Sequence, residues 1–567
     1  MRLTSTGFWS HGALRPLIAV AAIGPPACAA DAVPPADLVL INGVVYTMDA
    51  ALPQAEAVAI RDGRIIYVGA EDGARVYIGD RTTVDDLQGK VVLPGFHDAH
   101  THLIWSAAQL EDVDLYRAVT VDELLELIAT RAAEEPDEPW VIGAGWNVAL
   151  FDGVLDRALL DGIVADRPVF MVSADAHSAW VNSAALAAAG ITADTRDPAG
   201  GIIERDAAGE PTGILREAAI RLVAHRIPPY SDAQVDKGFT KAQVEASSYG
   251  ITSIIEANAT PQVLDGYRRF EDRGELAVRV HAAVGVDPAG GTAQLAEIEL
   301  MRAQYQTALV QVNAVKLYLD GVIESKTAVM LEPYSDGTNG TPVFSDEALS
   351  SIAVAFDQAG FQLHAHAIGD GATRQMLDAI ERVIEVNGAR DRRPLLAHLE
   401  VIDPDDIPRF DALGAYANFQ PLWASPDSYI TELTQPVIGP ERSEWLYPIG
   451  AVAEAGGMIV AGSDWSVSSM NPFLAMEVAV TRQDPRVPDG PVLTPQHRVG
   501  VQQILEAYTI HGARAAFVED ELGSVEAGKR ADLIVVDRDP FAIDPHELSE
   551  VQVLRTLLDG QEMYRAP

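Results

Sequence analysis

Cysteine and basic residues are scarce in this chain. Its 567 residues include one cysteine, Cys28, so no second thiol is present with which to form an internal disulfide. Lysine and arginine total 41 against 82 acidic residues, a formal net charge of −41, and no basic cluster stands out. This balance argues against nucleic acid and anionic membrane surfaces as partners. It is typical of a solvated acidic surface, and a preference for cationic substrates is the second interpretation.

The apolar run near the N-terminus is short. "PLIAVAAIG" (16–24) follows Arg2 and Arg15 and precedes the small residues of "PPACAA", which predicts a signal peptide over 1–29, cut after Ala29 or Ala30. The run is too short for a permanent membrane anchor. We therefore expect an exported protein, periplasmic or secreted. A lipoprotein site at Cys28 is an alternative, although Pro-Pro-Ala is a poor match to the sequence that such sites require.

The sequence patterns at both ends of the mature chain predict β-strands. "ADLVLINGVVYTMD" (36–49) and "AEAVAIRDGRIIYVGA" (55–70) each contain an Asn-Gly or Asp-Gly turn between β-branched runs. "GSVEAGKRADLIVVDRDP" (523–540) and "VQVLRTLLDGQEMYR" (551–565) contain similar β-branched runs, and the second includes another Asp-Gly turn. We expect 36–92 and 523–567 to combine into one small β-sandwich domain.

The middle of the chain alternates strands with helical stretches, which is typical of βαβ units and a parallel sheet. Eight apolar runs, such as "GITSIIEA" (250–257), predict a closed (β/α)₈, TIM-like barrel over 93–522, an α/β fold with its site at the carboxyl ends of the strands. The segment 104–236 is too long for one crossover and predicts an inserted lobe after strand one. The expected strand ends are His102, Glu256, Val286, Lys316, His366, His398, Gln420 and Asp464.

"PGFHDAHTHL" (94–103) places three histidines at the end of the first strand. Side chains alternate between the two faces of a strand, so His100 and His102 share a face and His97 has the opposite parity. Two imidazoles at positions i and i+2 are a common beginning of a metal site. His97 is interpreted as a packing residue or as a support behind the ligands.

The other strand ends supply further ligand types. Four imidazoles, one carboxylate and one lysine converge on one barrel mouth, a set that suits zinc and similar divalent ions; its members are His100, His102, Lys316, His366, His398 and Asp464. The lysine has two interpretations. Lys316 forms a carbamate with carbon dioxide and bridges two metals, or it remains an amine paired with Asp320 or Glu324.

The ordered motifs resemble the metal-dependent amidohydrolase superfamily over about 38–565. They are "PGFHDAHTHL", "VKLYLDG" (315–321), "HAHAIGDGA" (364–372), "AHLE" (397–400), "AGSDWSV" (461–467) and "GSVEAGKRADLIVVD". "GWNVALFDG" (145–153) and "DAHSAWVNSAAL" (175–186) are similar to the YtcJ-like branch, which includes N-substituted formamide deformylases.

The resemblance implies one or two metals, expected to be zinc. His100, His102 and Asp464 would bind the more buried ion, His366 and His398 the second, and carbamylated Lys316 would bridge them. The neighbouring His364 shares parity with His366 and is expected to lie deeper.

The implied reaction is hydrolysis of a C–N amide-type bond: an N-acyl or N-formyl amine, or a cyclic amide. Asp464 would take a proton from water and deliver it to the leaving amine. The same site would serve a lactone, ester or carbamate hydrolase, or a deaminase, and a metal-containing binding protein is the non-enzymatic alternative. The partner is a small molecule, and a homo-oligomer is compatible with the sequence.

Residues outside the ligand set are also candidates. The branch resemblance places His177 near a substrate carbonyl or oxyanion and Asn182 in the site. Trp105 and Trp465, next to expected ligands, favour a wide pocket for an aromatic or bulky group. Glu256 is interpreted as a salt-bridge partner or a supporting carboxylate at least as readily as a ligand.

Overall fold

The structure is a computed structural model that describes residues 33–567 apart from 148–150, 152, 175–176, 199–200 and 488. The predicted signal peptide, the lipoprotein alternative at Cys28 and the cleavage site lie outside the described residues. Within the described part of the chain, no helix is long and apolar enough to cross a membrane.

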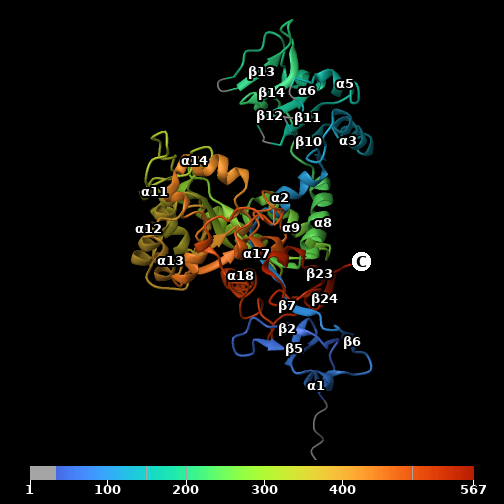
Figure 1. The fold of residues 1–567 in the computed structure, drawn as a ribbon, viewed down its shortest axis with the longest axis vertical. Coiled ribbons are helices and arrows are strands. Elements are labelled where there is room, and N and C mark those ends of the chain that lie inside the picture. Colours follow the sequence, from blue (N-terminus) through green and yellow to red (C-terminus); the bar gives the residue numbers. More distant parts are fainter. Residues whose placement is uncertain (1–32, 148–150, 152, 175–176, 199–200, 488) are drawn as a thin grey trace, which may run out of the picture.

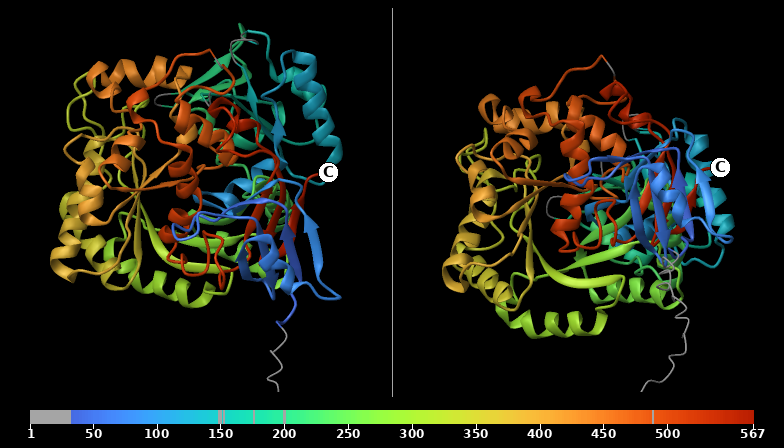
Figure 2. Two further views of the ribbon diagram at one scale, coloured as in Figure 1. Left: turned by 60° about the horizontal axis from the view of Figure 1, so that its bottom comes forward. Right: turned by 90° about the horizontal axis from the view of Figure 1, so that it is seen from below.

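Eight parallel strands form the central barrel (Figures 1 and 2). Their spatial order is the chain order, from β8 to β15 and on to β21. The last strand returns to the first, because the backbone N–H of Asp464 donates to the carbonyl of His100 at 2.7 Å and that of His102 donates to Trp465 at 3.0 Å. The strands are β8 (Phe96–Thr101), β15 (Ile251–Ala259), β16 (Arg279–Gly285), β17 (Val310–Tyr318), β18 (Gln362–Ala367), β19 (Leu395–His398), β20 (Tyr416–Phe419) and β21 (Met458–Ala461).

Helices cover the outside of the barrel, each with an apolar face toward the strands. In α9, the buried residues Val263, Tyr267 and Phe270 recur at helical spacing, and Thr260 caps the first turn by accepting from the backbone N–H of Val263. The main barrel helices are α2 (Leu103–Ala107), α8 (Asp232–Ser248), α9 (Pro261–Asp272), α10 (Leu295–Tyr305), α11 (Asp346–Gln358), α12 (Asp370–Asn387), α13 (Ile407–Leu413), α14 (Gln435–Ile438), α15 (Pro440–Ser443), α16 (Ile449–Glu454), α17 (Pro472–Thr481), α18 (Val501–Tyr508) and α19 (Ile510–Ala515).

The two chain ends meet in a pair of small sheets. β7 joins them, because it pairs in parallel with β2 and antiparallel with β22 from the far end of the chain. Leu40 and Val58 from one end and Leu533 and Val535 from the other share one buried apolar cluster. The strands are β1 (Leu38–Ile41), β2 (Val44–Tyr46), β3 (Gln54–Ala55), β4 (Ala57–Arg61), β5 (Arg64–Gly69), β6 (Thr83–Asp86), β7 (Val91–Pro94), β22 (Leu533–Val536), β23 (Val553–Leu558) and β24 (Gln561–Arg565), with the short helix α1 (Glu71–Ala74).

A separate lobe follows the first barrel strand and projects from the barrel in Figure 1. It has its own six-stranded sheet and its own buried clusters. Its elements are β9 (Val113–Asp114), β10 (Val141–Trp146), β11 (Val169–Ser173), β12 (Ser178–Val181), β13 (Gly201–Arg205), β14 (Pro211–Glu217), α3 (Val121–Glu134), α5 (Arg157–Asp161), α6 (Ser183–Ala189) and α7 (Ile220–Ala224). The predicted fold class, a (β/α)₈ barrel with a β-sandwich from both termini and an inserted lobe, is confirmed.

Candidate active site

A cavity of about 860 Å³ opens at the carboxyl ends of the barrel strands. All six residues predicted as metal ligands line it: His100, His102, Lys316, His366, His398 and Asp464. They come from five strand ends, so the parallel arrangement brings together residues more than 360 positions apart in the chain. The site is therefore built by strand geometry and not by one local motif.

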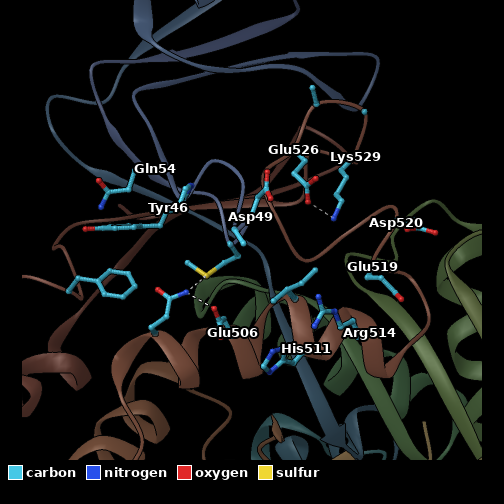
Figure 3. A pocket seen from close by; sticks show the side chains of 18 residues that line it. Tyr46, Asp49, Gln54, Glu506, His511, Arg514, Glu519, Asp520, Glu526 and Lys529 are labelled. Atoms are coloured by element: carbon cyan, nitrogen blue, oxygen red, sulfur yellow. Dashed lines mark hydrogen bonds and ion pairs between the residues drawn. The ribbon is translucent and has the colours of Figure 1, made fainter. Parts of the chain in front are cut away.

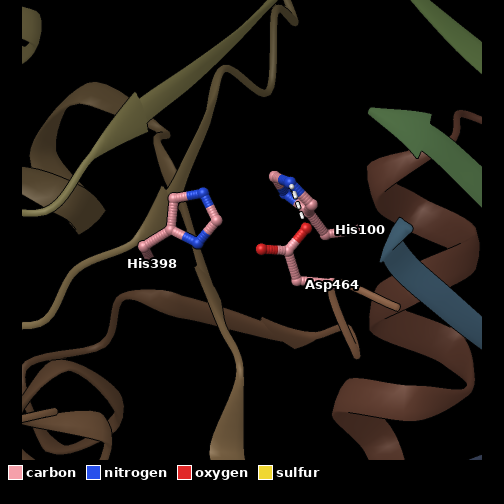
Figure 4. Close-up of side chains that lie close together, drawn as sticks. All are labelled: His100, His398 and Asp464. Atoms are coloured by element: carbon pink, nitrogen blue, oxygen red, sulfur yellow. Dashed lines mark ion pairs between the residues drawn. The ribbon is translucent and has the colours of Figure 1, made fainter. Parts of the chain in front are cut away.

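His100, His398 and Asp464 form the tightest group (Figure 4). One ligand atom from each lies within 4.8 Å of the others, and all three residues are buried. Oδ1 of Asp464 is 3.5 Å from Nε2 of His100 and 3.2 Å from Nε2 of His102, yet it makes no well-aligned hydrogen bond with the described residues. A buried carboxylate oxygen facing imidazole nitrogens fits a divalent cation, because such an ion satisfies all of these lone pairs together.

Lys316 lies directly beside this group. Its side chain is fully buried, and Nζ is 3.2 Å from Nε2 of His100. Burial lowers the pKa of this amine to about 7. Among the described residues it forms no ion pair within 4.0 Å with Asp320 or Glu324; instead, Asp320 accepts backbone N–H groups, including those of Ile368 and Gly369. The structure therefore does not show the ion pair with Asp320 or Glu324 that the second interpretation of Lys316 requires.

His102 is oriented by a buried carboxylate. Oε1 of Glu256 lies 3.6 Å from Nδ1 of His102, and the hydroxyl of Tyr267 donates to Oε2 of Glu256 at 2.6 Å. Burial lowers the pKa of His102, but the nearby carboxylates of Asp464 and Glu256, 3.2 and 3.6 Å from its ring nitrogens, outweigh it and raise the pKa to about 9. Glu256 thus acts behind His102, since a carboxylate on the far nitrogen fixes the ring and leaves Nε2 to face the site.

The two histidines of β18 have different places. His366 lines the cavity, with Nε2 3.2 Å from the carbonyl of Gly321. His364 is fully buried beneath it, and its Nε2 is 3.0 Å from Nδ1 of His100. The pair shows why alternation alone does not separate them: both face the barrel interior, and only the depth differs.

His398 is held by its neighbours and by a constrained backbone. Its Nδ1 is 2.8 Å from Oε1 of Gln420, and its ring stacks on Trp423 with centroids 5.5 Å apart and planes 4° apart. The φ angles of His398, Leu399 and Asp464 are 80°, 50° and 52°, in the left-handed region that non-glycine residues rarely occupy. Backbone strain of this kind concentrates at functional sites, where the surrounding structure enforces it.

A second hollow, of about 1500 Å³, lies between the β-sandwich and helices α18 and α19 (Figure 3). Several of its polar groups bind one another: Lys529 pairs with Glu526 at 2.8 Å, and Gln502 donates to Glu506 at 2.7 Å. None of the six predicted ligands lines it. The barrel cavity, not this larger hollow, is the candidate site.

Known proteins that are similar to this chain agree with the site described above. A family model described as the amidohydrolase family matches residues 83–564. The chain belongs to the amidohydrolase family. It is 31% identical to YtcJ of Bacillus subtilis over 92% of this chain and 98% of that protein. It is also 31% identical to N-substituted formamide deformylase of Arthrobacter pascens, over 93% of this chain and 98% of that enzyme.

A solved structure agrees with the fold. An uncharacterized metal-dependent hydrolase from Pyrococcus furiosus superimposes with a TM-score of 0.73 and 26% identity, covering 89% of this chain and 99% of that one. The predicted resemblance to the amidohydrolase superfamily and its YtcJ-like branch is confirmed. This amidohydrolase is accordingly a hydrolase that acts on C–N bonds, with a candidate metal site at its barrel mouth.

Two expected substrate contacts have structural roles in this amidohydrolase. Asn182 is completely buried in the lobe: Oδ1 accepts from the backbone N–H groups of Val169 and Ala185, and Nδ2 donates to the carbonyls of Val164 and Arg167. With each polar atom engaged, its side chain has no group left for substrate.

Trp465 is likewise not a wall of the cavity. It is 6% exposed, packs in the barrel core, and uses its backbone to join the last strand to the first.

His177 and Trp105 are both exposed but differ in position. His177 lies on the lobe with 68% of its side chain exposed, and its Nδ1 is 3.0 Å from Oε1 of Glu217. It is not among the residues that line the cavity. Trp105 does line the cavity, 63% exposed, with its ring near that of His102. The structure thus keeps Trp105 at the mouth and leaves His177 outside it.

Several cavity residues were not predicted from the sequence as part of the site. They are Tyr318, Glu324, Glu400, Asp427 and Tyr429. A signal existed for Tyr318, because it follows the predicted ligand Lys316 by two positions on β17 and so shares its strand face. Glu324, Glu400 and Asp427 lie outside helices and strands and Tyr429 begins the π-helix η5 (Tyr429–Thr434), so no strand periodicity indicates the direction of these side chains.

Proposed function

We propose that this amidohydrolase cleaves the amide bond of an N-formyl or N-acyl amine, or of a cyclic amide, with a divalent metal, expected to be zinc. The observation that supports it most directly is the buried group of His100, His398 and Asp464, whose free carboxylate oxygen faces the cavity. The similarity to a formamide deformylase over nearly the whole chain supports the substrate class.

The residues present fit such an ion. His100, His102 and Asp464 would hold the deeper position, His366 and His398 the outer one, and Lys316 would join them as a carbamate. A divalent cation bound there supplies Lewis acidity, which lowers the pKa of water toward neutrality and polarises a carbonyl.

The chain's own groups supply the proton transfers and the positioning. Asp464 takes the proton of the attacking water and returns it to the leaving amine, as a general base and then a general acid. Glu256 keeps His102 in one orientation throughout. The cavity walls, including Trp423 behind His398 and Trp105 at the mouth, hold the substrate and restrict bulk water.

Lys316→Ala is expected to lower kcat by about 100-fold or more, since it removes the bridging carboxylate. Acetate or propionate at millimolar concentration should restore part of the activity by occupying the space left by the side chain. In wild type, ¹³C-bicarbonate should give a carbamate carbon signal in NMR spectra that the variant lacks. Lys90→Ala, on the β-sandwich, serves as the matched control. Wild-type activity of Lys316→Ala without any carboxylate would refute the carbamate.

The proposed function is tested with a substrate panel on metal-loaded enzyme. The panel contains N-formyl and N-acetyl benzylamines, anilines and amino acids, a cyclic amide, and the matching esters and lactones. We expect the formyl or acyl amines to give the highest kcat/KM, with activity removed by a chelator and restored by zinc. Faster turnover of the esters or lactones would reassign the bond, and no turnover of any compound would favour the binding-protein alternative.

A further inference from the structure

A line of hydrogen bonds through two buried amides connects β8 to His398. Nδ2 of Asn418 donates to the carbonyl of Ala99 at 2.7 Å, and Nε2 of Gln420 donates to Oδ1 of Asn418 at 3.3 Å. Oε1 of Gln420 then lies 2.8 Å from Nδ1 of His398. Both amide side chains are completely buried, and neither residue lines the cavity. They lie at the end of β20, a barrel strand that supplies none of the six predicted ligands.

Strand geometry brings the two amides to this place. Asn418 lies near the end of β20 and Gln420 directly follows the strand, two positions later, so both side chains reach the same face. β20 pairs in parallel with β19, and Asn418 lies opposite Ala397 in their register. His398, the last residue of β19, is therefore next to the two amides and not across the barrel from them. The sequence of β20 thus places hydrogen-bonding groups where other strand ends carry ligands.

The direction of these hydrogen bonds is fixed at one end by a group that only accepts. The Ala99 carbonyl has no hydrogen to donate, so the Asn418 atom that faces it is the NH₂ nitrogen. Oδ1 of Asn418 then faces Gln420 and accepts from its NH₂ group, which turns Oε1 of Gln420 toward His398. Because an amide oxygen also only accepts, Nδ1 of His398 carries the ring hydrogen. In a neutral imidazole the lone pair then lies on Nε2.

The tautomer of His398 determines how this residue can act as a ligand. A metal binds the neutral ring, and the hydrogen bond made by one ring nitrogen decides that the other is left for the ion. Nδ1 of His398 is engaged by Gln420, so Nε2 is the nitrogen that remains. Stacking on Trp423, with the two planes 4° apart, limits rotation of the ring. A buried and fixed partner therefore prepares His398 for one mode of ligation before any ion binds.

We propose that Asn418 and Gln420 are positioning residues that hold His398 in the tautomer with the hydrogen on Nδ1 and the lone pair of Nε2 open to the metal. Asn418 acts only through Gln420, whose amide it orients. The inference rests on His398 being a ligand, as in the proposed function, but not on the bond that is cleaved. A partner that supports a ligand in this way contributes about 10- to 100-fold to metal affinity.

Zinc affinity, measured on the full-length chain by competition with a chromophoric chelator, tests the role of the acceptor oxygen. Gln420→Met has a side chain of similar length without that oxygen and should bind zinc about 10- to 100-fold more weakly. Gln420→Glu restores an acceptor and should stay within about 3-fold of wild type. Gln362→Met is the matched control, because Gln362 is buried at the start of β18, away from the site, and donates to the carbonyls of Arg393 and Ala515. The control should keep the wild-type affinity, and an equal loss in Gln420→Glu and Gln420→Met would contradict the role of the oxygen.

A measurement without metal separates this inference from the proposed function. NMR spectra of the metal-free chain labelled with ¹⁵N-histidine report which ring nitrogen carries the hydrogen, and the signals of His398 are assigned by their loss in His398→Asn. Wild type and Gln362→Met should show hydrogen on Nδ1, and Gln420→Met and Asn418→Leu should lose that pattern. The pattern in wild type supports the inference even if zinc does not bind, a result that would count against the proposed function instead. Hydrogen on Nε2 in wild type, or an unchanged pattern in both variants, would overturn the inference, and the wild-type spectrum decides by itself if the variants do not fold.

Discussion

Asp464→Asn is expected to lower kcat about 10²- to 10⁴-fold, even with metal at saturation. The substitution keeps the shape of the side chain and one oxygen, so a ligand remains, but an amide does not accept the proton of water at neutral pH. Asp464, whose Oδ1 lies 3.2 Å from His102 and 3.5 Å from His100, is the only carboxylate of the tight ligand group. No neighbouring group of that cluster replaces it as a base.

The measurement is kcat on the best amide of the panel, with metal content determined on the same samples. Asp272→Asn, an exposed carboxylate at the end of α9, is the control for loss of one negative charge. If Asp464→Asn at saturating metal retains activity within tenfold of wild type, Asp464 is a ligand without a role in proton transfer.

His100→Ala should abolish metal retention. His100 is fully buried at the centre of the site, with its Nε2 beside both Lys316 and Asp464 and its Nδ1 beside His364. Alanine removes that ligand nitrogen from the centre of the site, so metal binding weakens. We expect at least a 100-fold loss of affinity, above the range found for residues that only support a ligand.

Two readouts separate lost metal from lost folding. Metal content after dialysis should fall to about a tenth of wild type or less, given that loss of affinity. In wild type, metal at 100 times its dissociation constant stabilises the fold by about 2.7 kcal/mol, which raises the melting temperature; in His100→Ala this increase should disappear. His225→Ala, at an exposed helix end in the lobe, should behave as wild type. Undiminished metal in His100→Ala would contradict the assignment of the site.

Local rules account for the parts of the site that were predictable. Alternation along a strand separates His100 from His97, and apolar runs of strand length identify where Lys316, His366 and His398 end up. These are short-range properties, because each depends on a few residues around one strand end. The Asn-Gly and Asp-Gly turns at the two chain ends work in the same way, and both ends do join in one β-sandwich.

The structure places two of the expected residues, Asn182 and His177, away from the cavity. Asn182 follows His177 by five positions in the same motif, yet its four hydrogen bonds are to groups from 164 to 185 within the lobe. His177 is kept outside the cavity by the direction in which the lobe projects from the barrel. The sequence around His177 and Asn182 does not specify that direction, since it depends on packing between the lobe and the helices beneath it.

The amino-acid sequence was sufficient to identify the chemical groups of the site, whereas the shape of the cavity required the tertiary structure. The type of each ligand and the strand face on which it lies depend on a few consecutive residues, so the metal-binding strand ends can be predicted from them. The loops around the cavity cannot: the hydroxyl of Thr434 donates to Glu324, although these residues are 110 positions apart and neither lies on a strand. Their contact exists because a closed barrel forces its loops onto one mouth, a constraint that appears only when the last strand pairs with the first.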